Sequence, residues 1–533
     1  MNEKIDIPVA LTALSLEEKA ALLSGRNAWE TAGNERPRIA SVVLTDGPHG
    51  VRNLAADVRQ SGFGVAEPAT CFPTAAALGS SWDADLLTRV GEALGAESRA
   101  AGVAVLLGPG VNIKRSPLCG RNFEYLSEDP LVAGRLGAAL VSGVQSQGVG
   151  ASVKHFAANN QETERMRVSA EVDEWTLREI YLPAFEYIVR TAKPWTVMAA
   201  YNRINGVHAA QNRWLLTEVL REEWAFDGVV VSDWGAVADP VAAVAAGLDL
   251  EMPGTSGASA AQLVKAVQGG HLPEKALDQA VTRLLELLDR VAGGEPAHEV
   301  DFAAHHALAR RAAAESAVLL KNDGSILPLD ASGSIAVIGE LARTPRFQGA
   351  GSSQVNPVKV DNALEALELL FEPGYLLSGE PDTTLLDAAV AAAAVAEVVV
   401  VFLGLPEGEE SEGFDRRHID LPAVQLRLLE AVARVNQNVV VVLANGGVVE
   451  VASWQHHAKA VLEGWLAGQA GGGALADLLF GRVNPSGRLA VAPIFLAIGA
   501  TGGEKNYALL YFIAAAFTVA GGLVVLLRVK SVR

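Results

Sequence analysis

The chain is poor in cysteine and has no excess of basic residues. Only two cysteines, Cys71 and Cys119, occur in 533 residues, and they form neither a disulfide framework nor a metal-ligand spacing. This scarcity is typical of proteins from a reducing compartment. Lys and Arg number 43 against 61 Asp and Glu, which gives a formal net charge of −18. An acidic chain without a basic run argues against nucleic acid as a partner and favours a neutral small-molecule substrate.

Several other signals are missing from the sequence. The first residues carry no basic stretch followed by an apolar core, so no secretory signal is visible and we expect a cytoplasmic protein. The glycine-rich segments 349–353 and 404–408 contain neither the lysine of a P-loop nor a GxGxxG pattern. No nucleophile elbow and no metal-ligating cluster is present. We therefore expect no cofactor and no metal.

Helical and β-branched segments alternate along most of the chain, which is half hydrophobic and only 20% charged. This alternation predicts an α/β protein whose first part is a TIM-like (β/α) barrel, with an open doubly wound sheet as the competing architecture. A glycine-proline break then precedes an α/β sandwich with a parallel sheet. The predicted parts are a barrel (1–292), a linker (293–312), a sandwich (313–490), a loop (491–506) and an apolar helix (507–528).

A valine-rich segment, residues 229–231, predicts a strand buried on both faces. Asp233 follows where this strand should end. A carboxylate at the end of a buried parallel strand costs desolvation free energy, which a catalytic role would explain. The alternative is a helix N-cap, because residues 236–238 could begin a helix. This segment alone does not decide between the two.

Other predicted strand ends in the first part of the chain also carry polar residues. These are the carboxylate Asp46, the bases Lys154 and His155, the guanidiniums Arg121 and Arg165, and the aromatic residues Tyr201 and Trp234. Charged donors and acceptors around aromatic rings are suited to binding several hydroxyl groups against a ring face. The pattern therefore predicts a sugar site.

Hydrolysis of a glycosidic bond requires two carboxyl groups. The second is best sought in the predicted sandwich, where the acidic loop 407–416 follows a strand. This loop could equally be a solvated acidic face. Alternatively, repulsion among its glutamates could raise the pKa of one of them, as an acid catalyst requires.

Motifs in order along the chain resemble glycoside hydrolase family 3, particularly its β-glucosidases, from about residue 10 to about residue 490. The resemblance implies a barrel-like domain followed by an α/β sandwich, with the site between them. The motifs are TDGPHGVR (45–52), GRNFEY (120–125), SEDP (127–130), KHF (154–156), NNQET (159–163), VSDW (231–234), GAGSSQVNP (349–357), EGFDR (412–416) and NPSGRL (484–489).

The resemblance also implies roles for single residues. Asp233 would be the nucleophile, and Glu412 would be the general acid/base, with Glu410 as the second choice. The implied substrate-binding residues are Asp46, Arg121, Lys154, His155, Arg165, Met198, Tyr201 and Trp234.

By this resemblance the chain would be a retaining exo-acting β-glycosidase. The expected activity is that of a β-D-glucosidase, which releases the non-reducing-end glucose through a covalent glycosyl-enzyme intermediate. The substrate would be a small-molecule β-glucoside or an oligosaccharide. Two alternatives remain, a β-xylosidase of the same family and a catalytically impaired or non-catalytic, membrane-tethered sugar-binding product.

The resemblance stops after Leu489. Residues 507–527 are uncharged and almost wholly apolar, which predicts a transmembrane helix, a buried soluble helix being the alternative. Related β-glucosidases continue through the rest of the sandwich into a fibronectin-III-like domain. We therefore expect a C-terminally truncated family member joined to an unrelated tail, with membrane contact or anchoring through 507–528.

Overall fold

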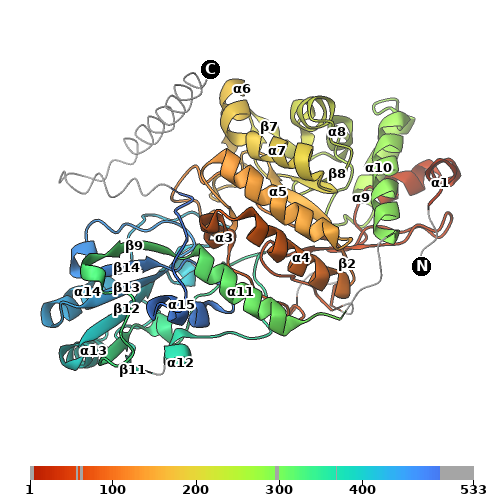
Figure 1. Cartoon of the computed structure of the whole chain (residues 1–533). Coiled ribbons are helices and arrows are strands. Elements are labelled where there is room, and N and C mark those ends of the chain that lie inside the picture. Colours follow the sequence, from red (N-terminus) through yellow and green to blue (C-terminus); the bar gives the residue numbers. More distant parts are fainter. Residues whose placement is uncertain (1–4, 56–57, 60–63, 294–298, 368, 492–533) are drawn as a thin grey trace, which may run out of the picture.

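The computed structural model describes residues 5–55, 58–59, 64–293, 299–367 and 369–491. A parallel sheet and a mixed sheet form the cores of two separate bodies, and helix α11 (Phe302–Ser316) runs between them (Figure 1). The predicted loop 491–506, except for its first residue, and the predicted transmembrane helix 507–528 lie outside the described residues. Within the described part, no helix has the length and apolarity needed to cross a membrane.

The first sheet consists of five parallel strands in the order β1-β2-β3-β5-β8. Their side chains are almost all buried on both faces, as the β-branched runs predict. Because the strands are parallel, their carboxyl ends all lie at the same end of the sheet. The strands are β1 (Val43–Asp46), β2 (Val103–Leu107), β3 (Gly150–Phe156), β5 (Thr196–Ala199) and β8 (Val229–Ser232).

This sheet is curled, and among the described residues only isolated bridges connect its two edge strands. Leu250 bridges to β8, Glu251 to Ser24, and Glu30 to β1. The expected barrel of regular strands is therefore reduced to a half-barrel with irregular closure. One physical reason lies at Asp249, whose carboxylate accepts the hydrogen bond of Val230 N at 2.8 Å, so a side chain takes part in the pairing there.

Helices cover the curled sheet and alternate with its strands. Ser15 and Glu18 form the capping box of α2, as their spacing predicts. The helices are α1 (Ile7–Ala13), α2 (Leu16–Leu22), α3 (Ala75–Ser81), α4 (Ala84–Ala100), α5 (Pro130–Ser146), α6 (Glu174–Thr176), α7 (Pro183–Ala192), α8 (Pro240–Ala246), α9 (Ala258–Gln268), α10 (Glu274–Ala292) and the π-helical segments η2 (Leu177–Tyr181) and η4 (Trp214–Glu223). A small sheet of β4 (Ser169–Ala170), β6 (Arg203–Ile204) and β7 (Val207–His208) lies in the connections that follow β3 and β5.

The second sheet has six strands in the order β11-β10-β12-β13-β14-β9. Five are parallel as predicted, but β9 pairs antiparallel with β14, so the sheet is mixed. Its strands are β9 (Val318–Asn322), β10 (Ile335–Ile338), β11 (Leu370–Glu372), β12 (Val398–Gly404), β13 (Val439–Ala444) and β14 (Ala460–Glu463), with helices α12 (Ala363–Leu367), α13 (Thr383–Val395), α14 (Ala423–Val435) and α15 (Gly471–Leu479).

Helix α11 occupies the second half of the predicted linker 293–312. It contacts α3 and α4 of the first body and α15 of the second, and Ala309 and Ala312 are fully buried. Small alanine side chains allow α11 to approach both bodies closely. Residues 302–312 are therefore a packed helix, not an irregular connection.

A buried carboxyl lies at the end of β14. Glu463 is 4% exposed and accepts hydrogen bonds from Trp465 N at 2.8 Å and from the Asn445 amide at 3.1 Å. Burial raises the pKa of Glu463 to about 7. Burial likewise lowers the pKa of Lys114, a nearby ammonium, to about 7.

Glu463 should make the folded state less stable as the pH rises from about 4.5 to about 7. In this window the folded protein keeps a proton that the unfolded chain releases, and the expected loss is on the order of 3 kcal/mol. The unfolding midpoint temperature of Glu463→Gln should therefore fall less steeply across this window than that of the wild type. The matched control is Glu365→Gln, at an exposed carboxyl; equal slopes in all three proteins would contradict the prediction.

Candidate active site

Asp233 lies directly after β8, at the edge where the parallel strands end. Its backbone N–H donates to Ala199 O at 2.9 Å, and its Oδ1 accepts the N–H of Trp234 at 2.8 Å. Oδ2 is buried, accepts no hydrogen bond from the described residues, and lies 3.8 Å from His155 Nε2. Asp239, not Asp233, caps the next helix, α8, so the N-cap interpretation of Asp233 is wrong.

A charged cluster fills the strand ends beside Asp233. Lys154 Nζ on β3 lies 3.9 Å from Asp46 Oδ1 at the end of β1 and 3.0 Å from Glu124 Oε1. Arg121 Nη2 lies 2.8 Å from Glu124 Oε2. Arg121, Lys154 and Glu124 are all at most 1% exposed. Three buried charges of alternating sign hold one another in place, which fixes Lys154 and Arg121 relative to Asp46.

Glu412 reaches this cluster from the second body, on the loop that follows β12. Its Oε1 lies 2.7 Å from Arg165 Nη1 and 3.7 Å from Arg121 Nη1. Arg165 also pairs with Glu162 at 2.8 Å. The loop after β12 therefore brings a second carboxyl to the residues that surround Asp233.

The glycine-rich segment 349–353 supports Glu412 from the other side. Ser352 N donates to Glu412 Oε2 at 2.6 Å. Gly351 has φ +92°, and a Cβ there would lie 2.5 Å from Glu412 Cβ. Only glycine suits this position, because both the backbone conformation and the approach of Glu412 exclude a side chain. The segment presents a backbone amide to a carboxylate, a role that its glycine content did not reveal.

The pKa shifts of the two carboxyls are opposite in direction to what a retaining mechanism requires, which is an ionised nucleophile and a protonated acid. Burial raises the pKa of Asp233, although Arg121 and Lys154 oppose it. Burial would also raise the pKa of Glu412, but the charges of Arg121 and Arg165 and the Ser352 hydrogen bond hold it well below its usual range. In the sugar-free protein Glu412 is therefore a carboxylate paired with guanidiniums.

The other basic and acidic groups of the cluster are also perturbed. Burial raises the pKa of Asp46 to about 6, against the opposing charges of Lys154 and Arg52. Burial and the neighbouring cations lower the pKa of His155 well below its usual range. His155 is therefore a neutral ring, which donates a hydrogen bond from one nitrogen and accepts a hydrogen bond at the other.

Of the aromatic residues, Trp234 is half-buried beside the cluster. It donates to Ala28 O at 2.7 Å, and its ring lies 5.5 Å from that of Trp29. The Tyr201 hydroxyl donates to Trp234 O at 3.0 Å, and the Arg165 guanidinium lies 4.8 Å from the Tyr201 ring.

Met198 differs from the other predicted substrate-binding residues. It is 2% exposed and belongs to the apolar cluster of Leu44, Val231 and Met252. The structure thus places Met198 in the core beneath the strand ends.

Glu410, the second choice for the acid/base, lies in a different environment. It is 1% exposed; its Oε1 accepts from Arg346 Nη1 and Gly446 N, both at 2.6 Å, and its Oε2 from Gly447 N at 2.7 Å. Arg346 and the other donors outweigh burial and lower the pKa of Glu410. Its bonds are those of a structural ion pair within the second body.

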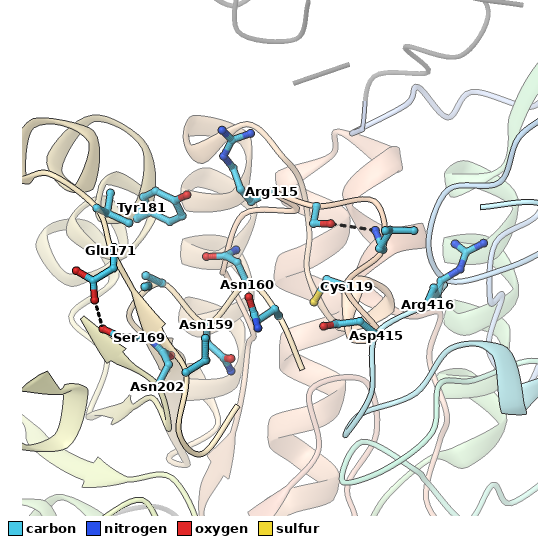
Figure 2. Close-up of a pocket in the computed structure, with 17 residues that line it drawn as sticks. Arg115, Cys119, Asn159, Asn160, Ser169, Glu171, Tyr181, Asn202, Asp415 and Arg416 are labelled. Carbon is cyan, nitrogen blue, oxygen red and sulfur yellow. Dashed lines mark hydrogen bonds between the residues drawn. The ribbon is translucent and has the colours of Figure 1, made fainter. Parts of the chain in front are cut away.

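A cavity of about 490 Å³ lies outside this charged cluster (Figure 2). Asn159, Asn160, Asn202, Asp415 and Arg416 are among its lining residues. None of the predicted catalytic or substrate-binding residues lines it. We therefore identify the candidate active site by its two carboxyl groups, which hydrolysis of a glycosidic bond requires. The size of this cavity is not the criterion.

Several residues that complete the site were not predicted from the sequence. Glu124, Glu162, Arg52 and Ser352 all contact predicted site residues, yet none was assigned a role. All four residues lie within the motifs quoted for the family resemblance, so the motifs contained the signal. The described residues include no cluster of three or more His, Cys, Asp or Glu that could hold a metal ion.

Comparison with protein families matches both bodies. Residues 20–287 match the glycosyl hydrolase family 3 N-terminal domain, and residues 317–493 match the glycosyl hydrolase family 3 C-terminal domain. The chain is 52% identical over 496 residues to the thermostable beta-glucosidase B of Acetivibrio thermocellus, covering 91% of this chain and 66% of that protein. It is 53% identical over 495 residues to an exo-alpha-(1->6)-L-arabinopyranosidase of Bifidobacterium longum, covering 90% and 65%. The chain thus spans slightly less than two thirds of the length of these relatives.

Solved structures show the same fold. A family 3 beta-glucosidase of Bifidobacterium adolescentis superposes with a TM-score of 0.85 at 53% identity, covering 90% of this chain and 70% of that one. Beta-glucosidase 3B of Thermotoga neapolitana, in complex with alpha-D-glucose, superposes with a TM-score of 0.84 at 36% identity, covering 91% and 75%.

Proposed function

The chain belongs to glycosyl hydrolase family 3, and from this premise we propose that it is a retaining, exo-acting β-glycosidase that releases glucose from the non-reducing end of β-D-glucosides. The observation that carries the proposal is the meeting of two carboxyls from different bodies, Glu412 and Asp233, near the shared charge of Arg121. Oδ2 of Asp233 accepts no hydrogen bond from the described residues. The names of the relatives from A. thermocellus and B. adolescentis support the same activity.

In the first step Asp233 Oδ2 attacks the anomeric carbon of the bound sugar. The C–O bond to the leaving group breaks as Glu412 transfers a proton to the departing oxygen. In the second step a water molecule attacks the anomeric carbon, Glu412 takes its proton, and Asp233 leaves as a carboxylate. Asp46, Lys154 and Arg121 would bind sugar hydroxyls, and Trp234 would pack against the ring.

Glu412 must gain a proton before the first step, although Arg165 and Arg121 hold it ionised in the sugar-free protein. Sugar hydroxyls that accept hydrogen bonds from Arg165 would draw its guanidinium away from Glu412. The pKa of Glu412 would then rise, because burial remains while the opposing charge moves away. Binding of the substrate thus prepares the acid.

A second candidate activity is supported by the B. longum relative, an arabinopyranosidase that is 53% identical to this chain. α-L-Arabinopyranosides and β-D-xylosides both lack the hydroxymethyl group of glucose. A β-xylosidase is therefore the third candidate, and all three share the two-carboxyl mechanism.

The test is a panel of p-nitrophenyl glycosides hydrolysed by the full chain. We expect kcat/KM for the β-D-glucoside to exceed those for the β-D-xyloside and the α-L-arabinopyranoside by at least about 10-fold, the discrimination expected when a site uses one extra substrate group. A higher value for either pentoside would replace the glucosidase assignment by that activity. No release of nitrophenol from any of the three would favour the non-catalytic, sugar-binding alternative.

A further inference from the structure

We propose that Asp415 is a positioning residue that fastens the Glu412 loop of the second body to the half-barrel and so sets the acid/base against the sugar. This inference rests on the proposed function, since Asp415 acts only through Glu412. It assigns a role to the last acid of the EGFDR segment, whose carboxylate has no part in the chemistry itself.

The Asp415 carboxylate accepts hydrogen bonds from three backbone amides of the half-barrel. Oδ1 accepts from Gly120 N at 3.1 Å and from Glu162 N at 2.9 Å, and Oδ2 accepts from Thr163 N at 2.9 Å. These amides belong to two loops, one beside Arg121 and one leading to Arg165. A single side chain of the second body thus binds both loops that carry the guanidiniums contacting Glu412. Hydrogen bonds to a carboxylate are stronger than neutral ones.

A carboxylate of the half-barrel also binds the backbone of the Glu412 loop. Glu162 Oε2 on the half-barrel accepts from Gly413 N at 2.8 Å, one residue after Glu412. The same oxygen lies 2.8 Å from Arg165 Nη1, which itself holds Glu412. Glu412 is therefore flanked by two carboxylates, each of which crosses between the bodies to backbone amides.

Close packing at Gly120 leaves the loop no room to shift toward the half-barrel. A Cβ at Gly120 would lie 1.8 Å from Phe414 O and 2.3 Å from Ser411 O, both on the Glu412 loop. Arg416 N also donates to Leu118 O at 2.8 Å. Contacts on both sides of Glu412 thus hold the loop against the half-barrel, together with the hydrogen bonds of Asp415.

Two variants test this role from opposite sides of the contact. Asp415→Asn removes the charge and places an NH₂ group against a backbone N–H; Gly120→Ala pushes against the Glu412 loop. The matched controls are Asp382→Asn and Gly408→Ala. Asp382 also accepts two backbone N–H groups with one oxygen, at 2.9 and 3.0 Å, but caps α13. A Cβ at Gly408 meets nothing within 4 Å.

The readout is the dependence of kcat/KM on the leaving group, across aryl β-D-glucosides from phenyl to 2,4-dinitrophenyl. A displaced acid slows only substrates whose leaving group needs a proton. We expect both variants to lose about 10- to 100-fold on the phenyl glucoside, and less than about 3-fold on the dinitrophenyl glucoside, since a small misplacement can cost on the order of 10²-fold. Both controls should match the wild type on every substrate.

Reactivation by azide is a second readout, and a mere loss of folded protein would not produce it. It attacks the glycosyl-enzyme at the anomeric carbon without needing a base, forms a C–N bond and releases Asp233. Azide should therefore raise the turnover of the dinitrophenyl glucoside by Asp415→Asn and yield β-glucosyl azide, while the controls show neither effect.

The outcomes separate the two proposals. An inactive wild type would contradict the proposed function itself. With an active wild type, an equal loss on all leaving groups in both variants, or no loss in either, would overturn the positioning role of Asp415. Failure of both variants to fold while both controls fold would also overturn it, because the contact would then be needed for docking the bodies.

Discussion

Asp233→Asn should lower kcat for aryl β-D-glucosides by on the order of 10⁴- to 10⁶-fold, the range seen when a covalent nucleophile is removed. A neutral amide cannot displace the leaving group, yet Asn keeps the size of Asp. Its carbonyl oxygen can still accept the hydrogen bond of Trp234 N, now 2.8 Å from Asp233 Oδ1. Folding should therefore survive the change. The substitution also removes a buried carboxylate, whose desolvation destabilises the folded state and raises the pKa of Asp233. The unfolding midpoint temperature should therefore not fall.

The measurement pairs turnover with trapping of the intermediate. A 2-deoxy-2-fluoro-β-glucoside should add one sugar mass to the wild type, on the peptide that contains Asp233, and none to Asp233→Asn. The matched control is Asp239→Asn, six residues along the chain, where Asn remains a good N-cap for α8. It should keep wild-type turnover. Label on Asp233→Asn, or turnover within about 10-fold of the wild type, would assign the nucleophile elsewhere.

The residues at strand ends were predictable because two simple signals coincide there. The run 229–231 predicts a buried strand, and the polar residue just after it must lie at the edge where parallel strands end. The same argument placed Asp46, Lys154 and His155, and the structure brings all of them together. The family resemblance added Glu412, which lies far away in the sequence.

The features that the sequence did not predict depend on contacts between distant segments. The closure of the half-barrel through Ser24, Glu30 and Glu251 leaves no periodic pattern, because single bridges need no run of alternating residues. The ion pairs of Glu124 with Arg121 and Lys154 hold Arg121 beside Glu412, and the sequence alone does not show these pairs. Crowding among glutamates was one of two interpretations of the acidic loop; in the structure, the guanidiniums of Arg121 and Arg165 lie beside Glu412 instead.

Glu412→Gln should lower kcat/KM for phenyl β-D-glucoside by about 10²- to 10⁴-fold, the usual contribution of general acid catalysis. For 2,4-dinitrophenyl β-D-glucoside, whose leaving group departs without a proton, kcat/KM should fall by less than about 10-fold. Hydrolysis of the intermediate still needs a base, so kcat should drop on this substrate and azide should restore it.

The matched variant is Glu410→Gln, two residues earlier on the same loop. Its carboxylate is bonded to Arg346 and to two backbone amides, so the change leaves a buried guanidinium poorly paired. Breaking a buried pair costs on the order of 3–5 kcal/mol, and the unfolding midpoint should therefore fall. The dependence on the leaving group should remain that of the wild type. If Glu410→Gln, and not Glu412→Gln, steepened that dependence, Glu410 would be the acid, and the guanidiniums around Glu412 would serve only to join the two bodies.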